Sequence, residues 1–181
     1  MKRLFLGIPL PTETVSALAT YLAPYRADQH LQDAKWTTPE NHHFTVFFLG
    51  DIADSIVPEV QTILKGVVGH ISPFTLDFEH VEFFSYKVPK MIWARFQRSL
   101  GFLELSQECR KFCQPYMAEP DDGKEPIPHV TLARLRQPVD PRKFSFKPLS
   151  LPPVEVTGMN LYESDLTPNG PVYTVLDHYD F

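Results

Sequence analysis

Two similar stretches organise this chain: HHFTVFFLG at residues 42–50 and PHVTLAR at residues 128–134. Each is a short apolar run that contains the pattern His-x-Thr, first at His43 and Thr45 and then at His129 and Thr131. Successive side chains on a strand point to opposite faces, so each histidine shares a face with its threonine. The stretches therefore predict two strands that each present an imidazole and a hydroxyl on one side.

The sequence around the two stretches repeats. A strand-like run precedes each one, RLFLGIP from Arg3 and MIWARF from Met91, and a helical stretch follows each run, at residues 11–24 and 99–115. The histidines are 86 residues apart and the leading runs begin 88 apart. Further strands are expected at residues 74–80, 154–161 and 171–178, and a further helix at 55–68.

This repeat predicts an α+β fold. We expect two pseudo-symmetric lobes of antiparallel sheet with helices outside, and a central cleft that receives one His-x-Thr motif from each lobe. The chain is expected to form a single bilobal domain over residues 1–181.

Composition narrows the class of partner and the compartment. A net charge of −5 over 181 residues excludes a generally basic nucleic-acid-binding surface. The cysteines are Cys109 and Cys113, whose spacing fits neither a redox pair nor a zinc site, so we expect reduced thiols. Pro9 and Pro11 interrupt the apolar N-terminal run, and no stretch is long enough for a membrane span. We expect a monomeric, cytoplasmic protein that has no membrane partner.

The duplicated histidines point to acid–base chemistry on a phosphate. A single histidine is more often a surface or core residue, but equivalent placement in both repeats argues against coincidence. A neutral imidazole can take a proton from water while a protonated one gives a proton to a leaving oxygen. Two histidines are too few to hold a catalytic zinc, and the sequence has no Gly-x-Ser-x-Gly elbow or phosphate-binding glycine loop. No metal and no cofactor are expected.

The quoted stretches, together with RLFLGIPLP at the start and LYESDLTPNGPVYTVL at the end, resemble the two-histidine (2H) phosphoesterase superfamily. Within it the chain is most similar to the bacterial RNA 2′,3′-cyclic phosphodiesterases, also called 2′-5′ RNA ligase-like proteins. The resemblance implies a hydrolase that opens the 2′,3′-cyclic phosphate at an RNA end to a 2′-phosphate without a metal, with weak reverse 2′-5′ ligation. RNA or oligonucleotide ends with a cyclic phosphate are then the expected partners.

The resemblance also implies roles for single residues. His43 matches the proton donor to the leaving 3′-oxygen and His129 the proton acceptor that activates water, while Thr45 and Thr131 match the phosphate-binding threonines. His42 receives no role. Arg134 is a further candidate for the phosphate, although regular alternation would turn it to the face opposite His129 unless the strand ends or bulges.

Alternative functions remain open at this point. The same fold could act on small cyclic nucleotides or on 2′-5′-linked oligonucleotides, and a different class of function is a non-enzymatic module that binds RNA ends. Candidates for stacking on a base are aromatic residues near the motifs, namely Phe48, Phe84, Tyr86 and Tyr162.

Overall fold

The computed structural model describes residues 1–85, 87–117, 123–168 and 170–181. Its α-helices are α1 (Thr12–Arg26), α2 (Val57–Val68) and α3 (Leu100–Cys113). Its strands are β1 (Lys2–Pro9), β2 (Lys35–Trp36), β3 (His43–Ile52), β4 (Phe74–Leu76), β5 (Phe78–Phe84), β6 (Met91–Phe96), β7 (His129–Arg134), β8 (Val154–Val156), β9 (Gly158–Thr167) and β10 (Gly170–Asp180). Tyr86, a candidate for base stacking, lies outside the described residues.

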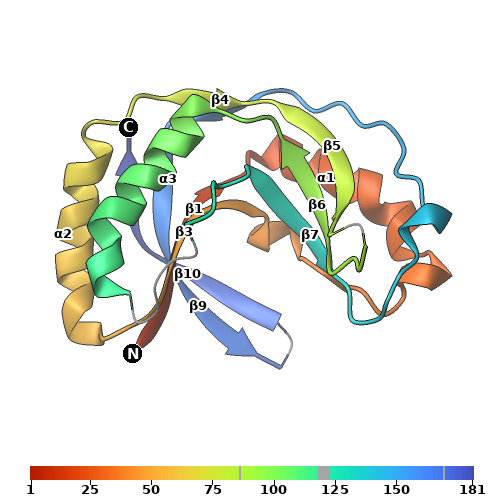
Figure 1. Cartoon of the computed structure of the whole chain (residues 1–181), viewed down its shortest axis with the longest axis horizontal. Helices are drawn as coiled ribbons and strands as arrows, with labels where there is room; N and C mark the ends of the chain where they lie inside the picture. The colour runs from red at the N-terminus through yellow and green to blue at the C-terminus, as the bar shows by residue number, and fades with distance from the viewer. Residues whose placement is uncertain (86, 118–122, 169) are drawn as a thin grey trace.

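A curved antiparallel sheet forms the centre of the molecule. Its strand order is β10-β9-β1-β3-β7-β6-β5, and β2 pairs with the free part of β7. Helices α2 and α3 lie side by side on one flank, and α1 covers the other (Figure 1). The predicted α+β fold, an antiparallel sheet with helices outside, is confirmed. The two strands that carry His-x-Thr, β3 and β7, meet in the sheet, with β1 and β9 beyond β3 matched by β6 and β5 beyond β7, and β10 added at one edge.

The two halves of the sequence interleave between the lobes. Strand β9 of the second half pairs with β1 and so extends the β1–β3 pair, while β5 of the first half pairs with β6 and extends the β6–β7 pair. The helices cross over as well. Ser106 of α3 donates a hydrogen bond to the Val46 carbonyl of β3 at 3.0 Å. In the other lobe Tyr25 of α1 contacts Phe146, which contacts Phe83 of β5. The first half therefore contributes α1 and β5 to the lobe of the second, and the second half contributes α3, β9 and β10 to the lobe of the first.

Two of the predicted strands were wrong as single strands. The run at 74–80 breaks at Asp77 into β4 and β5, and the run at 154–161 breaks at Thr157 into β8 and β9. The short pieces pair with each other in a separate two-stranded sheet, with Leu76 opposite Val154. The longer pieces then diverge into opposite halves of the large sheet. Apolar alternation continues from Leu76 to Phe78, so the sequence pattern does not reveal the first break. At the second break the alternation shifts by one residue, from Val156 to Met159.

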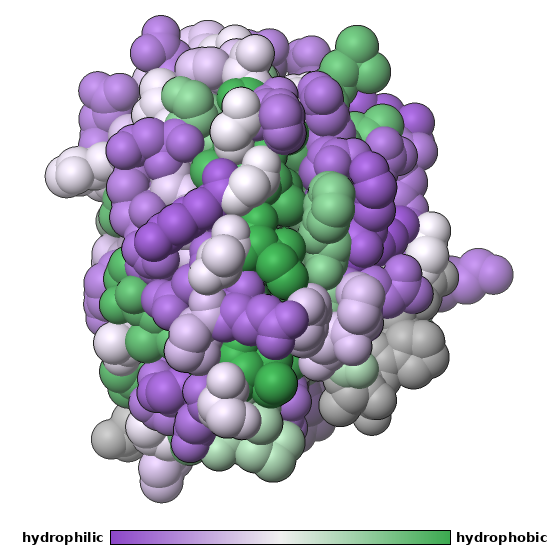
Figure 2. Space-filling view, turned by 90° about the vertical axis from the view of Figure 1, so that its left-hand side faces the viewer, coloured by the Kyte–Doolittle hydropathy of each residue, from purple (hydrophilic) through white to green (hydrophobic). Residues whose placement is uncertain are grey.

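The helices bury one face each, as their periodicity predicts. In α3 the buried set ends with Cys109 and Cys113, while Phe112, three residues after Cys109, is 41% exposed. At this turn the residue four positions after Cys109, which is Cys113, continues the buried face of the helix better than the residue three positions after it, which is Phe112. The flank that α2 covers is largely hydrophilic, with apolar side chains confined to a narrow strip (Figure 2). The described residues include no helix long and apolar enough to cross a membrane.

Candidate active site

A pocket of about 360 Å³ lies where β3 and β7 meet. All five residues proposed from the sequence line it: His43, Thr45, His129, Thr131 and Arg134. Its outer wall comes from β2 and the turn after it and from the β9–β10 hairpin. The structure thus brings together side chains that are far apart in the sequence.

The two histidines are held in the same way. The Nδ1 atom of His43 lies 2.8 Å from the carbonyl oxygen of Asn41, and that of His129 lies 2.7 Å from the carbonyl of Ile127. A carbonyl oxygen only accepts, so in each ring Nδ1 carries the hydrogen and Nε2 is the nitrogen left for chemistry. The Nε2 atom of His43 lies 3.2 Å from the hydroxyl oxygen of Thr45. Each histidine is therefore oriented by the carbonyl two residues before it.

The strand register sets the spacing of the histidines. Phe44 pairs with Val130 in antiparallel fashion, which turns His43 toward Thr131 and Thr45 toward His129. The histidines then occupy diagonal positions of the strand pair, and residues at such positions are about 7–8 Å apart. This separation suits a phosphate held between the two rings.

A bulge after each threonine explains why Arg134 faces the pocket. Opposite β6 the register skips Leu132, and opposite β1 it skips Val46. Both strands consequently show the same burial pattern, with two consecutive buried residues and then an exposed one, Arg134 in β7 and Phe48 in β3. The extra residue reverses the alternation, so the side chain that regular geometry would turn away points to the same side as the histidine.

The His43 ring lies in an aromatic enclosure. Phe5 and Tyr173 contact it with ring centroids at 4.9 and 5.2 Å. Burial lowers the pKa of His43 to about 4, the hydrogen bond to the Asn41 carbonyl acts in the opposite direction, and the charges of His129 and Arg134 lower it further. In the free protein His43 is therefore neutral at pH 7.

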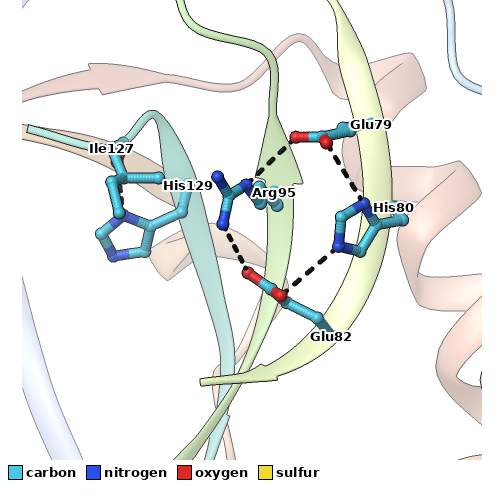
Figure 3. A network of polar contacts seen from close by, with 6 residues as sticks. All are labelled: Glu79, His80, Glu82, Arg95, Ile127 and His129. Carbon is cyan, nitrogen blue, oxygen red and sulfur yellow. Dashed lines mark hydrogen bonds and ion pairs between the residues drawn. The ribbon is translucent and has the colours of Figure 1, made fainter. Parts of the chain in front are cut away.

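An ion-pair network borders His129 on the side of β5 and β6. Arg95 is the cross-strand neighbour of His129, and its guanidinium forms ion pairs with Glu79 at 3.1 Å and Glu82 at 3.2 Å (Figure 3). His80 joins the two carboxylates, at 3.7 Å from Glu79 and 3.4 Å from Glu82. The network places two carboxylates and a guanidinium beside the proposed base.

These neighbours shift the proton affinity of His129 in opposite directions. Burial lowers the pKa of the imidazole, while its hydrogen bond to the Ile127 carbonyl raises it. The charge of Arg134 lowers the pKa further, and the carboxylate of Glu82 raises it. A neutral His129 at pH 7 fits the part of a proton acceptor.

His42 and the aromatic residues named as candidates for base stacking differ in whether they reach the pocket. His42 is only 4% exposed and alternates to the face opposite His43, in agreement with no assigned role. Among the aromatic candidates Phe48 lines the pocket, whereas Phe84 stacks on Trp93 and Tyr162 is 8% exposed against Phe5. Phe48 is thus the described candidate placed to meet a base.

Sequence reasoning missed several residues around the histidines. Asn41 orients His43 with its carbonyl and also donates from Nδ2 to the Pro171 carbonyl at 3.0 Å, which ties the hairpin to the pocket. Tyr173 and Trp93 contact the two imidazoles through pairing of distant strands, for which no local sequence signal exists. The doubled apolar pair after each threonine, as in Val46–Phe47, was the one local sign of a bulge.

The donor set of the pocket is unsuited to a tightly held cation. Within the part of the chain that the structure describes, no group of three or more His, Cys, Asp or Glu side chains is arranged to hold a metal ion. Arg134 also adds a fixed positive charge to the pocket. Hydroxyls, imidazoles and a guanidinium favour an anionic ligand.

Known proteins share this architecture. The family model for LigT-like phosphoesterases matches residues 8–93. An RNA 2′,3′-cyclic phosphodiesterase of Thermus thermophilus is 29% identical, over 98% of this chain and 89% of the relative. One of Thermotoga maritima is 27% identical, over 82% and 80%. The crystal structure of TT0787, also of Thermus thermophilus, superposes with a TM-score of 0.82 at 28% identity, covering 98% of this chain and 97% of that one. In its fold and over most of its length, the chain is similar to the LigT-like phosphoesterases.

Proposed function

We propose that this chain hydrolyses the 2′,3′-cyclic phosphate at the end of an RNA to a 2′-phosphate without a metal. The observation that carries the proposal is the pair of equivalent imidazoles, each with Nδ1 bonded to a carbonyl and both lining one pocket. The relatives named RNA 2′,3′-cyclic phosphodiesterase support the choice of substrate.

The reaction is an in-line displacement at phosphorus. His129 takes a proton from water through Nε2, the water oxygen bonds to phosphorus, and the bond from phosphorus to the ribose 3′-oxygen breaks. His43, protonated on Nε2, gives its proton to that oxygen. Attack and departure occur on opposite sides of phosphorus, and diagonal histidines on paired strands supply the two sides. The anionic phosphate raises the pKa of the imidazoles beside it, which offsets the effect of burial on His43.

The other pocket residues hold the phosphate and the nucleoside. The hydroxyls of Thr45 and Thr131 donate to the non-bridging oxygens, where negative charge increases in the transition state. Arg134 balances that charge and lies across the pseudo-two-fold from Phe48. An exposed phenyl ring and a guanidinium are both surfaces on which a base stacks, so the terminal base is assigned to this side of the pocket.

We also propose weak 2′-5′ ligation at the same site. When the 5′-hydroxyl of a second RNA replaces water, the same displacement forms a 2′-5′ bond and releases the 3′-oxygen. We further infer that the chain acts in the cytoplasm as a monomer. Cys109 and Cys113 are fully buried free thiols, which fits a reducing compartment.

A turnover assay tests the proposal. The purified chain is given an oligonucleotide with a 2′,3′-cyclic end and, separately, a 2′,3′-cyclic mononucleotide, with the His43→Ala/His129→Ala variant as control. We expect hydrolysis of the oligonucleotide by the wild type alone. A strong preference for the mononucleotide would assign the site to small cyclic nucleotides. Binding of the oligonucleotide without turnover of either substrate would make the chain an RNA-end binding module.

A further inference from the structure

The cross-strand neighbours of the two motif threonines differ, although the strands are equivalent. On β1, Gly7 pairs with Thr45, and on β6, Trp93 pairs with Thr131. The two positions correspond in the repeat because each follows the same register shift and faces the threonine of its motif. One position carries no side chain and the other carries the largest.

The indole of Trp93 lies flat on the ring of His129. The ring centroids are 3.7 Å apart and the planes differ by 22°. Phe84 stacks on the other face of the indole at 3.8 Å and 16°. Trp93 is 5% exposed, so it meets the histidine from behind instead of reaching the substrate. The stack of three rings fixes the plane of the imidazole.

Packing alone explains this tryptophan poorly. The Nε1–H group is buried, and among the described residues it meets no acceptor. A buried indole N–H usually finds a partner, because leaving it unpaired costs free energy. A phenylalanine or leucine would fill apolar space without that cost. Trp93 offers His129 a broad π-face. A phenylalanine would offer a smaller one, and a leucine would offer none.

The first lobe has no room for the same device. A Cβ atom added at Gly7 would lie 3.2 Å from both Cδ2 of His43 and Cε2 of Phe5. The rings that contact His43 are tilted instead, Phe5 by 37° and Tyr173 by 90°. The two histidines therefore have equivalent backbones and unequal ring environments.

We propose that Trp93 is a positioning residue for His129, which holds the imidazole plane and favours the protonated ring through its π-face. A cation over an indole face is attracted by the ring quadrupole. The protonated ring is the form that arises when His129 takes a proton from water, so the stack stabilises the transition state. This inference rests on the proposed role of His129 as the base of the reaction.

Other titratable groups lie near His129. They are Arg95 on β6, Glu82 on β5, Arg134 on its own strand β7 and His43 on β3, and Lys35 of β2 lines the same pocket. All of them are retained when Trp93 is replaced. A change in the proton affinity of His129 on replacement of Trp93 therefore reports the indole.

The test is an NMR titration of the His129 ring in the protein without substrate, its signal identified by its loss in His129→Ala. We expect Trp93→Leu to lower the pKa of His129 by roughly 0.5–1 unit, and Trp93→Phe to keep most of the wild-type value. Phe84→Leu is the matched control, because it removes the outer ring and leaves the contact of Trp93 with His129. Trp93→Met gives the same comparison if the leucine variant does not fold.

Kinetics supply the second readout. We expect the non-aromatic variants to lower kcat with little change in KM, and to move the maximum of the kcat/KM pH profile to lower pH. An unchanged pKa of His129 in Trp93→Leu or Trp93→Met, or a phenylalanine variant no better than these, would overturn the inference. Titration shifts as expected in a protein that turns over no cyclic phosphate would uphold the inference and refute the proposed function.

Discussion

Phe44 of β3 pairs directly with Val130 of β7, and this pair joins the two lobes at the centre of the sheet. Both side chains are fully buried, so the residues on either side of each one face the pocket. The four flanking positions are His43, Thr45, His129 and Thr131. One backbone pairing thus sets the geometry of both motifs, and a slip of either strand by one residue would turn the histidine of that strand into the core.

Loss of either histidine should remove most of the activity. We expect His43→Ala and His129→Ala each to lower kcat by at least about 10²-fold, the usual effect of losing a positioned acid or base. The double variant should be little worse than the worse single variant, because the two rings act as a unit. His30→Ala, on the exposed turn Gln29–Leu31, is the control in the same turnover assay. Near-normal turnover by His43→Ala would refute its assignment as the acid.

Arg134 should contribute to binding of the phosphate through its charge. We expect Arg134→Gln to lower kcat/KM by roughly 10- to 100-fold, the usual range for a hydrogen bond to a charged group. Thr45→Ala and Thr131→Ala should slow turnover less than either histidine variant. Arg136→Gln serves as the matched control, since Arg136 is an exposed cation beyond the end of β7. If the two arginine variants lowered kcat/KM equally, the effect would come from the overall electrostatic field of the protein and not from a contact of Arg134 with the phosphate.

The pH dependence should reflect the buried state of both rings. In the free protein burial lowers the pKa of His43 to about 4 and also lowers that of His129. As pH rises above these values both rings lose their protons, and the state with His43 protonated and His129 neutral becomes rare. We therefore expect kcat/KM to be bell-shaped with its maximum below pH 6.5, whereas unperturbed imidazoles would place it between about pH 6 and 8.

The profile of kcat should lie at higher pH than that of kcat/KM. It reports the complex, in which the substrate phosphate raises both imidazole pKa values. Both profiles can be measured on a cyclic mononucleotide. The limbs belong to the coupled pair and not to one ring. A maximum of kcat/KM at pH 7 or above would contradict lowered pKa values in the free protein.

The product identifies the bond that breaks. With water activated by His129 and the 3′-oxygen protonated by His43, hydrolysis must leave a 2′-phosphate. Phosphorus NMR of the hydrolysed cyclic nucleotide distinguishes it from the 3′-phosphate. A predominant 3′-phosphate would reverse the two roles even if both histidines were essential.

Chelation should leave the reaction unchanged. The proposed steps use imidazoles, hydroxyls and a guanidinium, so none of them needs a Lewis acid. We expect the same initial rate with and without EDTA. Activity that disappears with EDTA and returns with a divalent cation would show that the mechanism is misassigned.

The sequence by itself determined the repeated strand–helix–strand order, the α+β class and the residues of the site. These are local properties, because alternation and helical periodicity decide which side of an element is apolar. The duplicated motif added the pairing of His43 with His129, since equivalent positions in a repeat tend to meet at its symmetry axis. Even the orienting carbonyls of Asn41 and Ile127 lie within two residues of the histidines that they hold.

The tertiary structure decided the features that depend on which strands pair and in which register. A bulge against β6 turns Arg134 toward the pocket. The pairing of β4 with β8 sets the breaks at Asp77 and Thr157. The exchange of helices between the halves follows from which sheet face each helix can cover. Gly7 and Trp93 become counterparts only through register with the His-x-Thr strands. Pairing between segments distant in sequence has no local signal, because its free energy arises only after the strands have met.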